Sequence, residues 1–147
     1  MLNNEEFYFY YISLSTDFIK FDDYKTWLDK LFEADKNSTN VLLELEFCED
    51  DIEKTIYSLN IYLYDKIEQL DFKEVYILII NELKEQYTNT PNSLKELTHK
   101  LYDIWNLLPP KIAQEKPFLI FNSIDDYWDI LSKEQIVEKI KCLFDYY

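Results

Sequence analysis

Hydrophobic residues recur along most of this chain every three or four positions, which is the period of an amphipathic α-helix. Five such stripes are separated by turn-rich segments at residues 35–40 and 87–92 and by a proline pair at 109–110. The stripes consist of Tyr24, Trp27, Leu28, Leu31 and Phe32; Ile52, Ile56, Leu59, Leu63 and Ile67; Phe72, Val75, Ile79 and Leu83; Leu94, Leu97, Leu101, Ile104 and Leu108; and Ile136, Val137, Ile140, Leu143 and Phe144. Residues 39–47 predict a further short helix, so the pattern indicates a mainly α-helical protein.

Polar residues ahead of four stripes predict where the helices begin. In a capping box, a Ser, Thr or Asp at the N-cap and a Glu or Gln three residues later each bind a free backbone N–H group. The predicted boxes are Asp50 with Glu53, Asp71 with Glu74, Ser93 with Glu96, and Ser132 with Gln135. Asp22 is expected to cap the helix that precedes them.

Two other stretches are compatible with β-strands. Residues 5–14 place aromatic side chains at alternate positions, and residues 117–121 read Pro-Phe-Leu-Ile-Phe. Residues 75–80 are apolar on all sides, and the capping box before them favours a buried helix. We therefore expect a single domain over residues 1–147. It is a mainly α bundle of six or seven helices, and a minor two-stranded β element is left open.

Three features of the composition exclude most enzyme chemistry. The chain has no Gly, all 15 of its basic residues are Lys, and His99 is its only histidine. Without Gly there is no phosphate-binding P-loop, dinucleotide fingerprint or nucleophile elbow. Without Arg there is no bidentate fork for phosphate, and one histidine cannot make a two-histidine metal site. We expect a protein that is not an enzyme and that has no cofactor.

Charge and cysteine usage indicate the environment and the kind of partner. The net charge of −14 disfavours nucleic acid and anionic membranes and favours a basic protein partner. Acidity that only maintains solubility is the alternative. Two distant cysteines do not form a disulfide framework, the start lacks a signal-peptide pattern, and no apolar run reaches the length of a membrane span. We therefore expect a cytoplasmic protein.

The acidic segment from Glu44 to Glu53 is the first candidate for partner binding. Asp50 and Glu53 are assigned to a helix cap, and Asp51 would lie in the first helical turn, where the helix dipole favours negative charge. The candidate residues are Glu44, Glu46, Glu49 and Asp51. A solvated acidic face is the alternative.

Residues 35–46 also resemble an EF-hand calcium loop. Asp35, Asn37, Thr39, the Val41 carbonyl and Glu46 would supply the ligands. Asn40 stands where that loop has Gly, and Leu43 stands at a ligand position. A plain helix–turn–helix connection is therefore preferred, and no metal is expected.

The segment from Ser123 to Leu131 is the second candidate for partner binding. Tyr and Trp give protein interfaces much contact area at low entropic cost. The candidate residues are Asp125, Asp126, Tyr127, Trp128 and Asp129. The alternative is a capped turn with both rings in the core. His99 is expected to face water or a partner.

A small, acidic, Tyr-rich chain without catalytic motifs resembles the immunity proteins of bacterial contact-dependent and polymorphic toxin systems. It also resembles phage-encoded inhibitors such as DNA mimics and anti-CRISPR proteins. Both resemblances are of type and composition over the whole chain. They imply inhibition by binding, in which an acidic face covers a basic active site, often that of a nuclease. An immunity protein is our first hypothesis. A phage inhibitor and an acidic adaptor or structural subunit are the alternatives.

Overall fold

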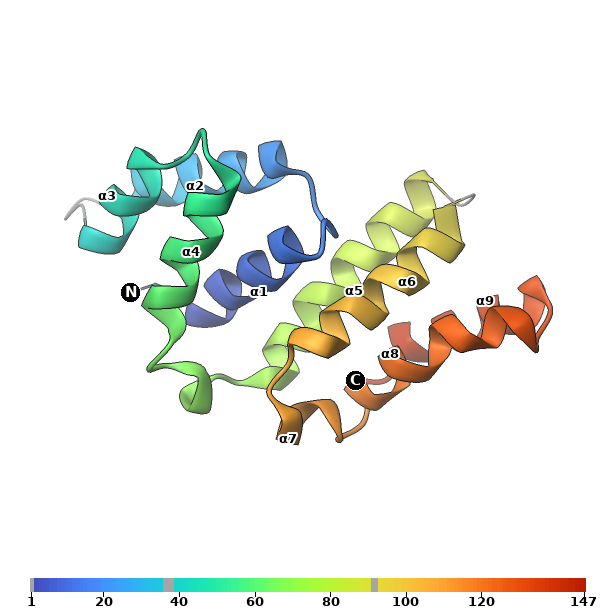
Figure 1. The fold of residues 1–147 in the computed structure, drawn as a ribbon. Helices are drawn as coiled ribbons and strands as arrows, with labels where there is room; N and C mark the ends of the chain where they lie inside the picture. Colours follow the sequence, from blue (N-terminus) through green and yellow to red (C-terminus); the bar gives the residue numbers. More distant parts are fainter. Residues whose placement is uncertain (1, 36–38, 91–92) are drawn as a thin grey trace. The chain divides into compact units, whose positions relative to one another are not determined.

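The computed structural model describes residues 2–35, 39–90 and 93–147. These residues form nine α-helices and no β-strand, which confirms the mainly α prediction (Figure 1). The helices are α1 (Asn4–Ser15), α2 (Phe21–Ala34), α3 (Asn40–Phe47), α4 (Ile52–Leu63), α5 (Phe72–Asn89), α6 (Leu94–Leu107), α7 (Pro110–Ala113), α8 (Phe118–Ile124) and α9 (Lys133–Phe144), with the 3-10 helices η1 (Ile67–Gln69) and η3 (Asp125–Asp129). The expected count of six or seven was too low, because α1 and the short helices α7 and α8 were not predicted.

The two-stranded β element that the sequence left open is absent from the described residues, because both candidate stretches are helical. Residues 5–14 lie in α1, and residues 118–121 lie in α8. α1 buries side chains on more than one face, so its aromatic residues imitate the alternation of a strand. Asn3 caps α1 by accepting the Glu6 amide over 3.1 Å. Burial of the apolar side chains of α1 then stabilises the helix rather than a strand.

The chain divides into two compact units, residues 1–71 and residues 72–147. In the first unit α1 packs on α4, and α3 packs on both α4 and α2. The buried side chains at the centre of this unit include Phe7, Ile12, Tyr24, Leu28, Leu42, Leu45, Leu59 and Leu63. Trp27 stacks on Tyr10 with ring centroids 4.2 Å apart, and its indole N–H donates to Glu6 over 3.1 Å. The expectation of one domain over the chain stays a prediction.

In the second unit α5 packs on α6 and α9, and α6 packs on α8. η3 contacts α6, α8 and α9. Residues 75–80 lie inside α5 and are largely buried, as predicted. The Tyr76 hydroxyl donates to the backbone carbonyl of Leu143 and so ties α5 to α9.

The predicted capping boxes have different outcomes. The box of Ser132 with Gln135 is formed, and its two hydrogen bonds measure 3.2 and 2.9 Å. The box of Asp50 with Glu53 is wrong, because α4 starts one residue later. Asp51 is the N-cap and accepts the amide of Lys54 over 3.1 Å.

The remaining helix starts also differ in their chemistry. α5 begins at Phe72, directly after Asp71, as predicted. Ser93 stands at the N-cap of α6 without capping it, because its hydroxyl donates to the Thr90 carbonyl over 2.8 Å. α2 begins at Phe21 without a side-chain cap, so Asp22 lies in its first turn instead.

Two buried tyrosines provide a matched test of the packing. The Tyr24 hydroxyl is buried and has no hydrogen-bond partner among the described residues, whereas the Tyr76 hydroxyl is bonded. Tyr24→Phe should leave the free energy of unfolding unchanged or raise it by up to ~1 kcal/mol, because no hydrogen bond is lost. Tyr76→Phe should lower it by about 1 kcal/mol, because the Leu143 carbonyl loses its donor. Urea unfolding followed by circular dichroism measures both. An equal loss of unfolding free energy in the two variants would show that the Tyr24 hydroxyl does have a hydrogen-bond partner.

Candidate functional site

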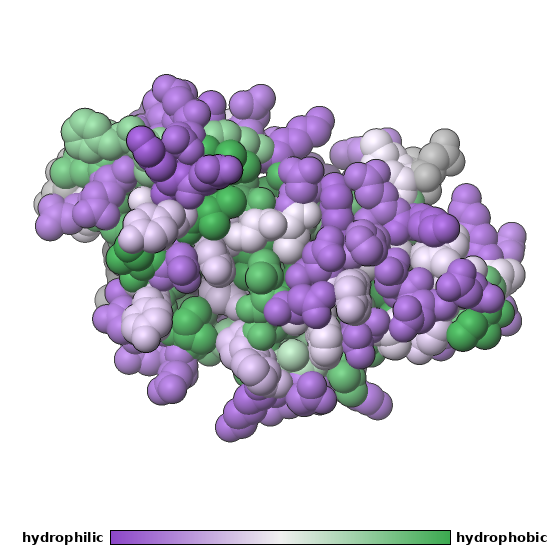
Figure 2. Space-filling view, viewed as in Figure 1, coloured by the Kyte–Doolittle hydropathy of each residue, from purple (hydrophilic) through white to green (hydrophobic). Residues whose placement is uncertain are grey.

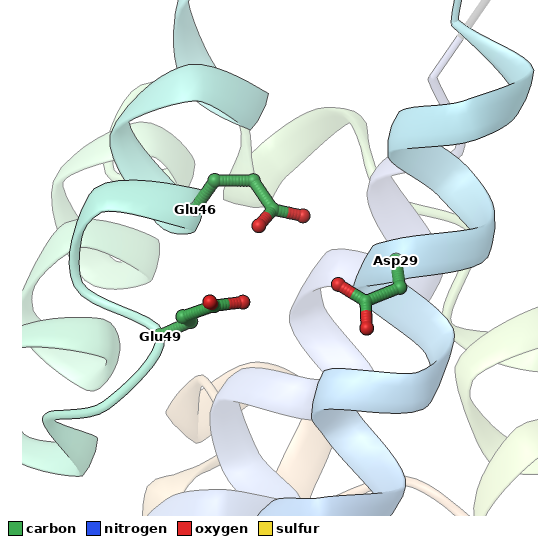
Figure 3. A group of neighbouring side chains, drawn as sticks. All are labelled: Asp29, Glu46 and Glu49. Carbon is green, nitrogen blue, oxygen red and sulfur yellow. The ribbon is translucent and has the colours of Figure 1, made fainter.

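Three carboxylates from separate parts of the first unit meet at one place. Asp29 lies on α2, Glu46 lies in the last turn of α3, and Glu49 lies in the turn that follows α3 (Figure 3). One oxygen from each side chain lies within 4.8 Å of the other two. Two of these residues are among the predicted partner-binding residues. Asp29 was missed, because only the packing of α2 on α3 brings it there. These three side chains are called the carboxylate trio below.

The turn between α3 and α4 positions two members of the trio. Leu42 and Leu45 are fully buried and hold the inner side of α3 in the core. After the helix ends, the backbone carbonyl of Cys48 accepts the Asp51 amide and the Thr55 hydroxyl, each over 2.9 Å. Thr55 is itself buried, so this connection is shielded from water. The turn thereby returns Glu49 toward Glu46 and toward α2.

The carboxylate trio carries like charges in close proximity. The pKa of Glu46 is raised to about 7, first by burial, then by a hydrogen bond with Glu49, and then by repulsion from Glu49 and Asp29. A protonated Glu46 donates to the Glu49 carboxylate, whereas an ionised Glu46 repels it. None of the three forms an ion pair with a lysine in the part of the chain that the structure describes.

An added positive charge would relieve this repulsion, and two chemical groups could supply it. One is a divalent cation, because hard cations take carboxylate oxygens as ligands. Calcium normally takes about six to eight oxygens, and the trio offers one close oxygen from each of its three carboxylates. The other is a lysine or arginine of a partner, which brings its own hydrogen-bond donors.

The two described ends of the EF-hand-like segment, Asp35 and Glu46, take part in different contacts. Its residues 36–38 lie outside the described residues. The Asp35 carboxylate accepts the amide and the hydroxyl of Thr39, the N-cap residue of α3, over 3.0 and 2.9 Å. Glu46, the last residue of that segment, belongs to the carboxylate trio. Asp35 therefore has a structural role at the start of α3.

The other acidic residues predicted in this segment lie outside the trio. Glu44 is exposed on α3. Asp51 is exposed and caps α4, which is a structural role. Asp50 forms an ion pair with Lys25 of α2 at 3.7 Å. Of the four predicted residues in this segment, the fold brings Glu46 and Glu49 together.

The second predicted segment forms η3 in the second unit. The Trp128 ring is half-buried, and its indole N–H donates to the buried Thr98 hydroxyl over 2.7 Å. The Tyr127 ring lies 5.1 Å from the Lys139 ammonium. Trp128 thus joins η3 to α6. This contact resembles the alternative interpretation of the segment, in which the rings pack against the protein itself. Its role in partner binding stays a prediction.

The three aspartates of η3 differ in their surroundings. Asp125 contacts His99 at 3.0 Å from the ring Nδ1, and Asp103 lies 3.8 Å from the other ring nitrogen. The hydrogen bond with Asp125 and the two negative charges raise the pKa of His99, which is exposed as expected. Asp126 and Asp129 are exposed.

Comparison of the chain with family models, curated proteins and solved structures gives no match. Across the described ranges, no helix is both long enough and apolar enough to cross a bilayer. Function is therefore inferred from the charge and geometry of the chain itself, and the carboxylate trio is the arrangement that needs explanation.

The raised pKa of Glu46 predicts a measurable dependence of stability on pH. The folded state binds the proton of the Glu46 carboxyl group more tightly than the unfolded state does. Protonation of Glu46 therefore stabilises the folded state at low pH, and this stabilisation is lost as the pH rises through about 7. At about pH 8, Glu46→Gln should therefore raise the free energy of unfolding by ~1 to 2 kcal/mol, a value reduced because the side chain is partly solvated. At about pH 5 the gain should be small.

Denaturant unfolding at several pH values measures this effect. Glu44→Gln, on the exposed side of the same helix, is the matched control and should leave the pH dependence in place. A Glu46→Gln variant that is no more stable than the parent at the higher pH would show that the trio is not under electrostatic strain.

Proposed function

We propose that this chain is a non-catalytic binding protein that neutralises a basic protein partner, specifically an immunity protein that blocks a cognate bacterial toxin. The carboxylate trio is the observation that carries the proposal. It gathers three acidic side chains without a lysine paired to them within the described residues. A protein selected only for solubility has no reason to hold like charges this close.

The trio is suited to a positively charged side chain. A partner's lysine or arginine placed among Asp29, Glu46 and Glu49 would replace repulsion with charge-assisted hydrogen bonds. Arginine fits best, because its planar fork contacts two oxygens at once. Binding would also favour the ionised form of Glu46, so a proton would leave as the complex forms.

The charge of the whole chain supports a basic protein rather than nucleic acid as partner. A net charge of −14 attracts a basic surface over a long range and raises the rate of encounter. The basic active site of a nuclease toxin is a surface of this kind. A phage-encoded inhibitor would use the same physics, and the identity of the partner distinguishes the two.

Association kinetics against a toxin encoded beside this chain test the proposal. The Asp29→Asn, Glu46→Gln, Glu49→Gln variant should associate about tenfold more slowly at low salt, because the local attraction is lost. Its association rate should also depend less on salt concentration. Surface-binding kinetics at low and high salt give both quantities. Co-expression of the parent chain should relieve the growth defect that the toxin causes.

The matched control removes the same number of carboxyl groups from the second unit. Glu85→Gln, Glu115→Gln and Glu134→Gln change three exposed residues and leave the formal net charge of the two triple variants equal. This control should associate nearly as fast as the parent. If both triple variants slow association equally, the trio is no more than part of the general charge.

A further inference from the structure

Exposed apolar side chains are concentrated in one segment of the first unit. Ten large hydrophobic residues are exposed among the described residues, and six of them lie between residues 43 and 64. They are Leu43, Phe47, Ile52, Tyr57, Ile61 and Tyr64. Figure 2 shows hydrophobic and near-neutral surface along α4 with hydrophilic side chains beside it. Exposed apolar surface that is gathered in one place and bordered by polar residues is typical of interaction sites, whereas single exposed apolar residues are ordinary.

The helix α4 is apolar on two opposite faces. Its inner face, which includes Leu59 and Leu63, is buried, and α4 packs on α1. Its outer face presents Tyr57 and Ile61, and Tyr64, the C-cap residue, continues the same line in helical conformation. These three residues are 66, 57 and 83% exposed. Their spacing of four and three residues places them on one line of the helix. They are called the outer stripe below.

The dimensions of the outer stripe suit another helix. From its first to its last residue, the stripe rises by about 10 Å, which is two helical turns. Two helices that pack side by side contact each other over segments of this length, with side chains of one between those of the other. Tyrosines contribute rigid area to such a contact, because their side chains lose little entropy on binding.

The charges around the outer stripe identify the kind of helix that fits. Glu53 lies one turn before Tyr57 on the same face and is exposed. Asp65, which follows Tyr64, is exposed and already forms an ion pair with Lys66 at 3.1 Å. Phe47, which is 91% exposed, stands between Glu46 and Glu49 of the trio in the sequence. The net charge of −14 and the exposed Glu53 favour basic residues that flank an apolar line. They also disfavour a second copy of this acidic chain or an anionic lipid surface.

We propose that the outer stripe binds a basic amphipathic helix of the partner protein. Apolar residues of that helix contact Tyr57, Ile61 and Tyr64, and a flanking lysine or arginine faces Glu53. This inference rests on the proposed function, because it assumes a basic protein partner. It places the anchoring contacts on α4 rather than on Trp128, whose indole N–H is bonded to Thr98.

Two synthetic peptides of leucine and lysine test the proposal with the full chain. The first carries leucines at helical spacing on one face, and the second has the same composition in scrambled order. Fluorescence anisotropy of the labelled peptides should show that the amphipathic peptide binds at least about tenfold more tightly, because only it presents a continuous apolar face. Equal affinity for both peptides would mean that charge alone is recognised and would overturn the proposal.

Matched variants locate the binding site. Tyr57→Ser, Ile61→Ser and Tyr64→Ser together should weaken binding of the amphipathic peptide by about 10- to 100-fold, mainly through faster dissociation. Ile130→Ser, which changes a 76% exposed residue of the second unit, should leave affinity unchanged. Circular dichroism should show the parent helix content in both variants, because the changed side chains are exposed. Undiminished affinity of the stripe variant would overturn the proposal.

Two further measurements separate other occupants of the stripe. Sedimentation that shows a dimer of the parent chain and a monomer of the stripe variant would assign the stripe to self-association instead. Binding to phosphatidylglycerol vesicles that the stripe variant loses would assign it to a lipid surface. Slower binding of the toxin to the trio variant, together with unchanged binding to the stripe variant, would leave the proposed function standing and overturn only this inference.

Discussion

Two hydrogen bonds to the backbone carbonyl of Cys48 determine the arrangement on which both proposed surfaces depend. The amide of Asp51 and the hydroxyl of Thr55 donate to this oxygen. Because Thr55 is buried, water cannot replace its bond, and loss of the hydroxyl would leave a polar atom unsatisfied. These bonds set where α3 ends and how α4 leaves the turn. Glu46 and Glu49 then face α2, and the outer side of α4 stays exposed.

The carboxylate trio lowers the stability of the fold that positions it. Like charges at this distance oppose folding when all are ionised, and the pKa of Glu46 is raised by burial first and by this repulsion in addition. The cost is tolerable because a buried core of leucines and aromatic rings holds α3 against α2 and α4. Binding sites often retain interactions that are unfavourable in the free protein and become favourable when the partner is present.

The trio and the outer stripe would contribute to binding in different ways. Charge acts over about a Debye length and changes how fast two proteins meet. Apolar contact acts only after water has been removed and changes how long the complex lasts. The carboxylate trio and the outer stripe, both in the first unit, would together combine fast encounter with slow release. This combination suits a protein that must intercept its target quickly and hold it.

Local information in the sequence determined most of the helices and little of the candidate site. Helical periodicity predicted five of the helices, and the box of Ser132 with Gln135 forms as the sequence indicated, because these effects need only neighbours along the chain. Aromatic-rich α1 was ambiguous, since burial on several faces hides the helical period. Asp29 joined Glu46 and Glu49, and Trp128 bonded to Thr98, only through tertiary packing. Distances between side chains on separate helices depend on how whole helices pack, which no local pattern encodes.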